Sequence, residues 1–264
     1  MKKKLFCCLC FFVSQSIFAS SSPKVIKRDG FTIYLSCSMR AAVKFEYDLL
    51  KKIDVSSNTE YEFYYNRMSD MDVSRKCSQI NSISYSGFSF PEMNNAGINE
   101  NSSVKDLKLK RLKFLDGRLV PSYHLGNNLI NILETSYMTN ILPMHPVFYK
   151  EAWVVSNDII DCFRKKHNIH VEGGPLWTND IKNDVFFFTH GIRTPDYFWK
   201  IIELENKKFL SFLFPNDERS NLKNFKSFLT NISKMKSVVL SAKKYKEKDQ
   251  MSFNDIRREC KGEI

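Results

Sequence analysis

The sequence predicts a single domain that contains both strands and helices. Several short apolar runs are bounded by Gly, Pro and Asn, which is typical of strands. One longer segment, after two prolines, has apolar residues at helical spacing instead. Residues 20–264 suffice for a single large domain with a well-buried core.

Residues 1–19 have the features of a secretory signal peptide. Residues 2–4 are all lysine, residues 5–18 are largely apolar, and Ala19 is a suitable cleavage residue. The apolar run is too short to span a bilayer, and no later stretch is long and apolar enough. We therefore expect a secreted or periplasmic protein without a membrane anchor.

The chain carries a net charge of +11 at pH 7, of which residues 2–4 contribute three positive charges. A basic protein gains affinity for nucleic acid because its Lys and Arg side chains release counterions from phosphate. A composition rich in Lys and Asn, with its lysines solvated on exposed faces, would give the same charge. The charge is therefore compatible with DNA or RNA as a partner and does not establish one.

Four of the seven cysteines lie after the predicted signal peptide, namely Cys37, Cys77, Cys162 and Cys260. An even number of cysteines in an oxidising compartment predicts disulfides. Three pairings are possible, and four buried unpaired thiols are the alternative. None of these cysteines has the CxxC or Cys/His spacing of a zinc site.

Three strands are predicted early in the chain, at residues 31–35, 43–49 and 60–65. The second strictly alternates apolar with charged residues, which is the period of a half-buried strand. Residues 82–103 are rich in Ser, Asn and Gly and predict a long surface loop.

Residues 105–113 form a basic segment. Its leucines alternate as in a strand, so that the basic side chains, among them Lys110, Arg111 and Lys113, could share one face. Such a stripe beside a cleft could bind a phosphate backbone. A solvated strand face is the alternative.

Residues 115–157 contain three predicted elements in close succession. A Gly-containing turn leads into a Leu-Val-Pro sequence, and residues 137–142 then predict a short strand. Pro143 and Pro146 stop that strand, because proline cannot donate to a β-ladder. From about Val147 onward the spacing of apolar residues becomes helical.

The C-terminal part alternates strands with turns. Apolar strands bounded by Gly, Pro and Asn are predicted at residues 169–177, 194–204 and 209–216. Residues 225–238 predict a helix and turn that pack back on the core. The tail, residues 243–264, is charged and partly helical, and its cysteine could tie it to the domain.

The strand, stop and helix of residues 115–157 resemble the core of the DNA/RNA non-specific endonucleases. That family has an Asp-Arg-Gly-His segment that leads into Leu-x-Pro, and then a Thr/Ser-Phe/Tyr-x-Ser/Thr-Asn-Ile/Val-x-Pro strand. Its next helix carries a metal-binding Asn four residues before a Trp. The positions that match here are Gly117, Leu119, Pro121, Thr135, Thr139, Asn140, Ile141, Pro143 and Trp153.

The resemblance continues through the C-terminal strands, where Lys200 stands at the family's Lys position. It implies an α+β architecture, the ββα-metal (His-Me finger-like) non-specific endonuclease fold, with a central antiparallel sheet flanked by helices. It also implies a phosphodiester hydrolase in which a His takes a proton from the attacking water. One Mg²⁺ ion would neutralise charge on the phosphate.

Three positions depart from the family's pattern. Arg118 replaces the catalytic His, Tyr149 replaces the metal-ligand Asn, and Asn157 replaces a Glu that supports the metal site. A guanidinium accepts no hydrogen bond and cannot act as a base, although it can pair with phosphate. A neutral phenol is a weak ligand for Mg²⁺, so Tyr149 would stack on a base or fill the vacant space. We therefore expect nucleic-acid binding with hydrolysis weak or lost.

Further site residues follow from the same resemblance. Asn140 is the polar motif residue that survives, either as part of the catalytic site or as a support of the loop geometry. Arg67, after the opening strands, is a candidate phosphate contact, with a plain surface arginine as the alternative. His124 and His145 could substitute for the missing His, and His124 is a candidate substrate contact; a structural or surface role is the alternative for both.

Two other functions remain open at the level of sequence. The protein could be an active Mg²⁺-dependent endonuclease that uses substitute residues. It could also be a secreted interaction protein with no nucleic-acid role. Metal-dependent cutting would support the first, and a protein that neither cuts nor binds nucleic acid would support the second. A protein partner and the oligomeric state are not predicted.

Overall fold

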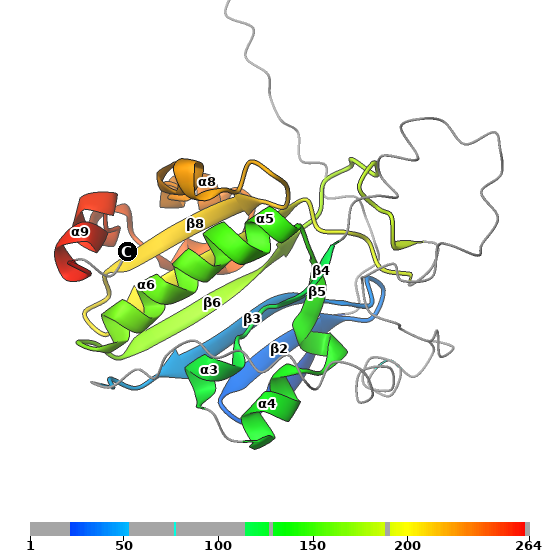
Figure 1. Ribbon diagram of the computed structural model, residues 1–264, viewed down its shortest axis with the longest axis horizontal. Coiled ribbons are helices and arrows are strands. Elements are labelled where there is room, and N and C mark those ends of the chain that lie inside the picture. The colour runs from blue at the N-terminus through cyan, green and yellow to red at the C-terminus, as the bar shows by residue number, and fades with distance from the viewer. Residues whose placement is uncertain (1–21, 53–76, 78–113, 127–128, 188–190, 262–264) are drawn as a thin grey trace, which may run out of the picture.

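The central sheet has six antiparallel strands in the order β1-β2-β3-β6-β7-β8 (Figure 1). The computed structural model describes residues 22–52, 77, 114–126, 129–187 and 191–261. The strands are β1 (Lys24–Arg28), β2 (Phe31–Ser36), β3 (Ala41–Leu49), β6 (Ile169–Leu176), β7 (Tyr197–Leu204) and β8 (Phe209–Pro215). This arrangement confirms the central antiparallel sheet that the resemblance to the endonuclease family implies.

The strand predictions near the N-terminus and after the long helix are confirmed where the structure describes the chain. In β3, the side chains of Phe45 and Tyr47 are buried and that of Asp48 is exposed, as the alternation predicts. The strand predicted at residues 60–65 and the loop predicted at 82–103 lie outside the described residues.

The predicted turn at the start of residues 115–157 is wrong. Leu115–Arg118 is a strand, β4, which pairs with β5 (Ile141–Met144) in a separate two-stranded ribbon. The strand predicted at residues 137–142 begins only at its last two residues, after a 3₁₀ turn, η2 (Met138–Asn140).

Pro143 does not stop β5, contrary to the prediction. It lies inside the strand, opposite Asp116. Its carbonyl oxygen accepts a hydrogen bond from Nδ2 of Asn216, which is outside the ribbon, at 3.0 Å. The N and O atoms of a strand residue point to the same edge, so the missing N–H of this proline costs the β-ladder nothing.

One continuous helical segment follows the ribbon and lies across the sheet (Figure 1). It consists of α5 (Pro146–Phe148), a π-helical turn, η3 (Tyr149–Trp153), and α6 (Val154–Arg164). A proline at the first helical position loses no hydrogen bond. His145 caps this end, because its Nδ1 accepts the backbone N–H of Val147 at 3.3 Å. The predicted start of the helix is confirmed.

Each face of the central sheet carries its own core. On the face under α6, Phe148 lies between Phe198 and Trp153, with ring centroids 5.2 and 5.5 Å away. On the other face, Trp199 belongs to a buried cluster that includes Met235. The remaining helical elements are α3 (Ser122–Leu125), α4 (Leu129–Thr135), η4 (Leu222–Phe228), α8 (Ile232–Lys236), η5 (Leu240–Lys244), η6 (Glu247–Asp249) and α9 (Phe253–Glu259).

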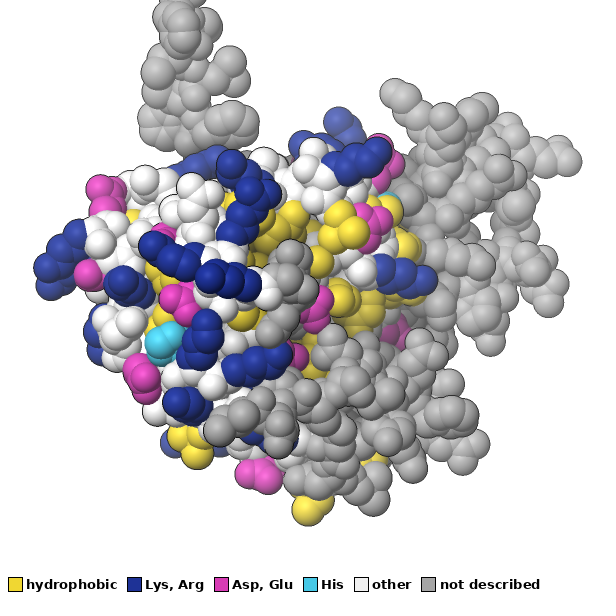
Figure 2. All heavy atoms as spheres, turned by 60° about the vertical axis from the view of Figure 1, so that its left-hand side comes forward, with side chains coloured by type: hydrophobic (Ala, Val, Ile, Leu, Met, Phe, Trp, Pro, Cys, Tyr) yellow, Lys and Arg dark blue, Asp and Glu magenta, His cyan; other side chains and the backbone are white. Residues whose placement is uncertain are grey.

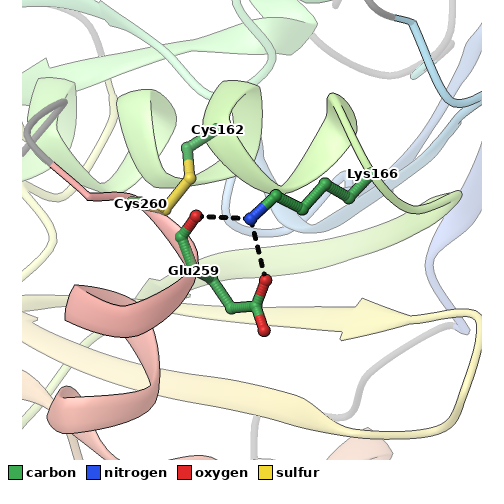
Figure 3. Close-up of a disulfide and its surroundings, with 4 residues drawn as sticks. All are labelled: Cys162, Lys166, Glu259 and Cys260. Carbon is green, nitrogen blue, oxygen red and sulfur yellow. Dashed lines mark hydrogen bonds and ion pairs between the residues drawn. A yellow bond between two sulfur atoms is a disulfide. The ribbon is translucent and has the colours of Figure 1, made fainter.

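All four cysteines of the predicted domain form disulfides, in the pairs Cys37–Cys77 and Cys162–Cys260. The second pair joins α6 to the end of α9 (Figure 3). Beside it, Nζ of Lys166 donates to the carbonyl oxygen of Glu259 at 2.8 Å and to its carboxylate at 3.1 Å. The prediction that the tail is partly helical and held by its cysteine is confirmed.

None of the helices in the described ranges combines the length and the apolar character needed to cross a membrane.

Candidate active site

A pocket of about 150 Å³ lies between the end of β4 and the helical segment η3–α6. The residues that line it are Arg118, Pro121, Tyr123, Tyr149, Trp153, Val154 and Asn157. The three positions that depart from the endonuclease pattern therefore lie around one pocket. Tyr149 and Asn157 are eight residues apart in one helical segment, which is a spacing that places two side chains on the same face.

Arg118, the last residue of β4, is held through both its side chain and its backbone. Its side chain is only 1% exposed, and Nη2 donates to Oγ of Ser136 at 3.1 Å. Its carbonyl oxygen accepts the indole N–H of Trp153 at 3.1 Å. The pocket wall thus contains a guanidinium in a fixed position, which can donate hydrogen bonds and cannot accept them.

Lys200, on β7, lies beneath the pocket and contacts Asn157 from below. Its Nζ donates to Oδ1 of Asn157 at 2.6 Å and to Oγ of Ser156 at 2.7 Å. The same nitrogen lies 3.5 Å from the centre of the Trp153 ring, a cation–π contact. The side chain is fully buried, and this burial lowers the pKa of the Lys200 amine well below its usual range.

The sequence analysis did not include Lys200 among the site residues. The available signal was a charged residue inside the apolar strand at residues 197–204, since a lysine is almost never fully buried without a partner. The partner, Asn157, is 43 residues away in the sequence. Only the packing of α6 on β7 brings the two together.

Asn140 supports the backbone and does not line the pocket. Its side chain is fully buried, and its Oδ1 accepts the N–H of Val120 at 3.0 Å. Its Nδ2 donates to the carbonyl oxygens of Val120 and Thr135 at 2.9 and 2.8 Å. These three bonds fix the segment that follows Arg118, so the structure favours the role in loop geometry.

His124 is turned away from the pocket, although the preceding residue lines it. Its imidazole is fully buried, with Nδ1 2.8 Å from the hydroxyl of Tyr47 and Nε2 3.6 Å from Oδ1 of Asp161. Burial lowers the pKa of His124 well below its usual range and raises the pKa of Asp161 to about 7. The structure therefore does not support His124 as a substrate contact or as a substitute base.

The other candidates lie elsewhere. His145 caps α5, as described above, and does not belong to the residues that line the pocket. Arg67, Lys110, Arg111 and Lys113 lie outside the described residues. Their contacts with phosphate therefore stay predictions.

Within the described ranges of the chain, the side chains close enough together to bind a metal ion are Glu46, His170 and Glu172, on β3 and β6. Glu46 and Glu172 lie directly opposite each other across the two strands, and the alternation of strands places them on the sheet face away from α6. Nζ of Lys44 already lies 2.7 Å from Glu46 and 2.9 Å from Glu172. This ammonium occupies the place that a cation would take, so the group is an internal ion-pair network.

The residues of the pocket do not fit Mg²⁺. This ion prefers carboxylate and other hard oxygen ligands. No carboxylate is present among the residues that line the pocket, as far as the described chain extends. The amide oxygen of Asn157 is taken by Lys200, and Arg118 adds a positive charge that would repel a cation.

Comparison with known proteins places this geometry in context. A family model described as DNA/RNA non-specific endonuclease matches residues 13–247. No curated protein matches the chain. Among solved structures 127 chains match. One of them is titled "Crystal structure of the EndoG/EndoGI complex: Mechanism of EndoG inhibition". It has a TM-score of 0.56 and 16% sequence identity, over 88% of this chain and 91% of that chain, which shows a shared fold.

Proposed function

Because this chain belongs to the DNA/RNA non-specific endonuclease family, we propose that it binds the phosphodiester backbone of DNA or RNA and hydrolyses it weakly or not at all. The observation that supports this proposal is the content of the pocket. Arg118, Tyr149 and Asn157 line it together, and the resemblance assigns them to the positions of the family's catalytic His, metal-ligand Asn and supporting Glu.

The loss of hydrolysis follows from the chemistry of Arg118. A general base must accept a proton from water, and a guanidinium has no lone pair with which to accept one. Loss of a general base costs about 10²- to 10⁴-fold in rate. We assign no step to Mg²⁺, because the pocket does not provide the oxygen ligands that this ion requires.

The retention of binding follows from charge. A guanidinium pairs with phosphate through charge-assisted hydrogen bonds. Lys and Arg side chains also extend over the face of the molecule that Figure 2 shows, with acidic side chains between them. The net charge of +11 attracts polyanions and speeds their encounter with the protein.

We also propose that the protein acts after export. Residues 1–19 read as a signal peptide, and the two disulfides require an oxidising compartment if they are to persist. The secreted or periplasmic location is therefore the compartment in which we expect it to meet nucleic acid.

The first experiment tests cutting and binding together. The full chain would be expressed with export, so that the disulfides form, and incubated with plasmid DNA and with RNA, in Mg²⁺ and in a chelator. We expect binding in both conditions and no cleavage. Cleavage that the chelator abolishes would overturn the loss of hydrolysis. Absence of binding to both nucleic acids would overturn the proposed function.

A variant that restores the family's residues tests whether positions 118, 149 and 157 account for the proposed loss of hydrolysis. The triple change Arg118→His, Tyr149→Asn and Asn157→Glu should confer Mg²⁺-dependent cleavage on the same scaffold. The matched control is Arg118→Lys with Tyr149→Phe, which keeps the charge and the ring and should stay inactive. If a folded triple variant, checked by its thermal unfolding curve, does not cut, these three positions are not sufficient.

A further inference from the structure

We infer that the contact between Lys200 and Asn157 makes this pocket a metal-independent binding site for a phosphate group. This inference rests on the proposed function and names the ligand chemistry of the same site. It depends on which atoms of the pocket can donate hydrogen bonds and which can accept them.

The direction of the bonds beneath the pocket is fixed by Ser156. Its hydroxyl donates to the carbonyl oxygen of Trp153 at 2.7 Å, so its oxygen can only accept from Lys200. Lys200 in turn donates to Oδ1 of Asn157 at 2.6 Å. An amine has N–H groups for both bonds whether or not it is protonated. The oxygen of the Asn157 amide is therefore occupied by its hydrogen bond to the buried Lys200.

Because Oδ1 of Asn157 bonds to Lys200, the polar atom of this side chain that can bind a ligand in the pocket is Nδ2, a hydrogen-bond donor. The guanidinium of Arg118 is also a donor only. A carboxylate at position 157 would also pair with Lys200, but its second oxygen would place a negatively charged hydrogen-bond acceptor in the pocket. With asparagine at this position, the polar groups of the pocket suit an anion that brings its own oxygens.

The charge balance points the same way. In the described part of the chain Lys200 makes no ion pair, and the ring of Trp153 covers its amine. The lining has no carboxylate, and its charged side chain is the guanidinium of Arg118. An anion in the pocket would be attracted by this guanidinium. A metal cation would be repelled.

The size of the pocket limits what it binds. A volume of about 150 Å³ is smaller than the roughly 300–1,000 Å³ of sites that enclose a whole small-molecule ligand. It suits one phosphate group, with the rest of a nucleic acid lying outside on the basic surface.

The test uses inorganic phosphate as the probe and the full exported chain, with binding measured by calorimetry in a chelator. Asn157→Asp exchanges the donor nitrogen for an acceptor oxygen without changing the shape of the side chain. We expect the natural protein to bind phosphate in the chelator and this variant to bind it at least about tenfold more weakly. The exposed Asn254→Asp adds the same charge on α9 and should leave the affinity unchanged.

A second variant keeps the inference testable if Asn157→Asp does not fold. Lys200→Met keeps a side chain of similar length and releases the amide of Asn157, so it should weaken phosphate binding by a similar factor.

Equal affinity in the natural protein and the folded variants, or binding that requires Mg²⁺, would overturn the inference. If phosphate binds as expected and nucleic acid does not, the proposed function fails and the inference stands. If nucleic acid binds and these variants change nothing, the inference alone fails.

Discussion

At the scale of single residues, the pocket differs from a hydrolytic site in the kind of atom that each side chain presents. Arg118 presents N–H donors at the position of a proton acceptor. Asn157 directs its oxygen toward Lys200 at 2.6 Å, away from the pocket. In the function proposed above, these two side chains together suit the pocket to an anion, because donors favour anions and acceptors favour cations.

The buried Asp161 provides a prediction about pH. Burial raises its pKa from 3.8 to about 7, so the folded protein keeps this proton at pH values where the unfolded chain has lost it. The stability that this group contributes is complete below about pH 4 and is lost as the pH rises through about 7. Asp161→Asn cannot lose a proton. Its free energy of unfolding, relative to that of the natural protein, should therefore rise by about 4 kcal/mol between pH 4 and pH 8.

Urea unfolding at several pH values would measure this difference. The exposed Asp29→Asn removes a carboxyl group from the surface and is the control for the change in charge. A constant difference for Asp161→Asn would show that the carboxyl group titrates in the folded protein as it does in the unfolded chain.

At the scale of elements, the β4–β5 ribbon and the helix beside it hold the pocket. Gly117 lies in β4 where any Cβ atom would collide with the side chain of Met144, so only glycine allows the two strands to approach. The bonds of Asn140 then fix the chain that leaves the ribbon. These contacts give a physical reason for Gly117 and Asn140, two of the residues that match the endonuclease motifs.

The two disulfides give a prediction at this scale. Their cysteines are 40 and 98 residues apart, and the longer loop should restrict the unfolded chain more. Loss of Cys162–Cys260 should cost about 4–5 kcal/mol, which is about 0.8 kcal/mol more than loss of Cys37–Cys77 in the chain-entropy model. Urea unfolding of the two double Cys→Ala variants would compare them. A greater loss from the shorter loop would mean that native contacts dominate over loop length.

At the scale of the whole molecule, the proposed binding of nucleic acid leads to a prediction about salt. The net charge is +11, and each phosphate that the protein neutralises releases counterions. The logarithm of the binding constant for duplex DNA should therefore fall linearly with the logarithm of the salt concentration, by about 0.9 for each phosphate contact.

A salt titration of DNA binding, followed by fluorescence anisotropy, would check this expectation. Arg118→Gln removes one of the proposed contacts, so the slope should become shallower by about 0.9. Binding that does not depend on salt would exclude the phosphate backbone as the main contact. An unchanged slope in the folded Arg118→Gln variant would place the contacts outside the pocket.

The candidate site could be predicted only in part. The spacing of Arg118, Tyr149 and Asn157 relative to the family motifs was sufficient to group them, and they do line one pocket. The direction of the His124 side chain was not predictable, because its partner Tyr47 is 77 residues away. The same holds for Lys200, whose role depends on packing between α6 and β7.

The sequence by itself determined the period of the strands, the start of the long helix, the even number of cysteines and the basic charge. These are local or additive properties, which do not depend on how distant segments meet. The tertiary structure alone decided which cysteines pair, that Pro143 lies within a strand, and that Asn157 directs its oxygen inward. Each of these depends on a contact between segments far apart in the chain, and such a contact exists only once the sheet, the ribbon and the helix have packed together.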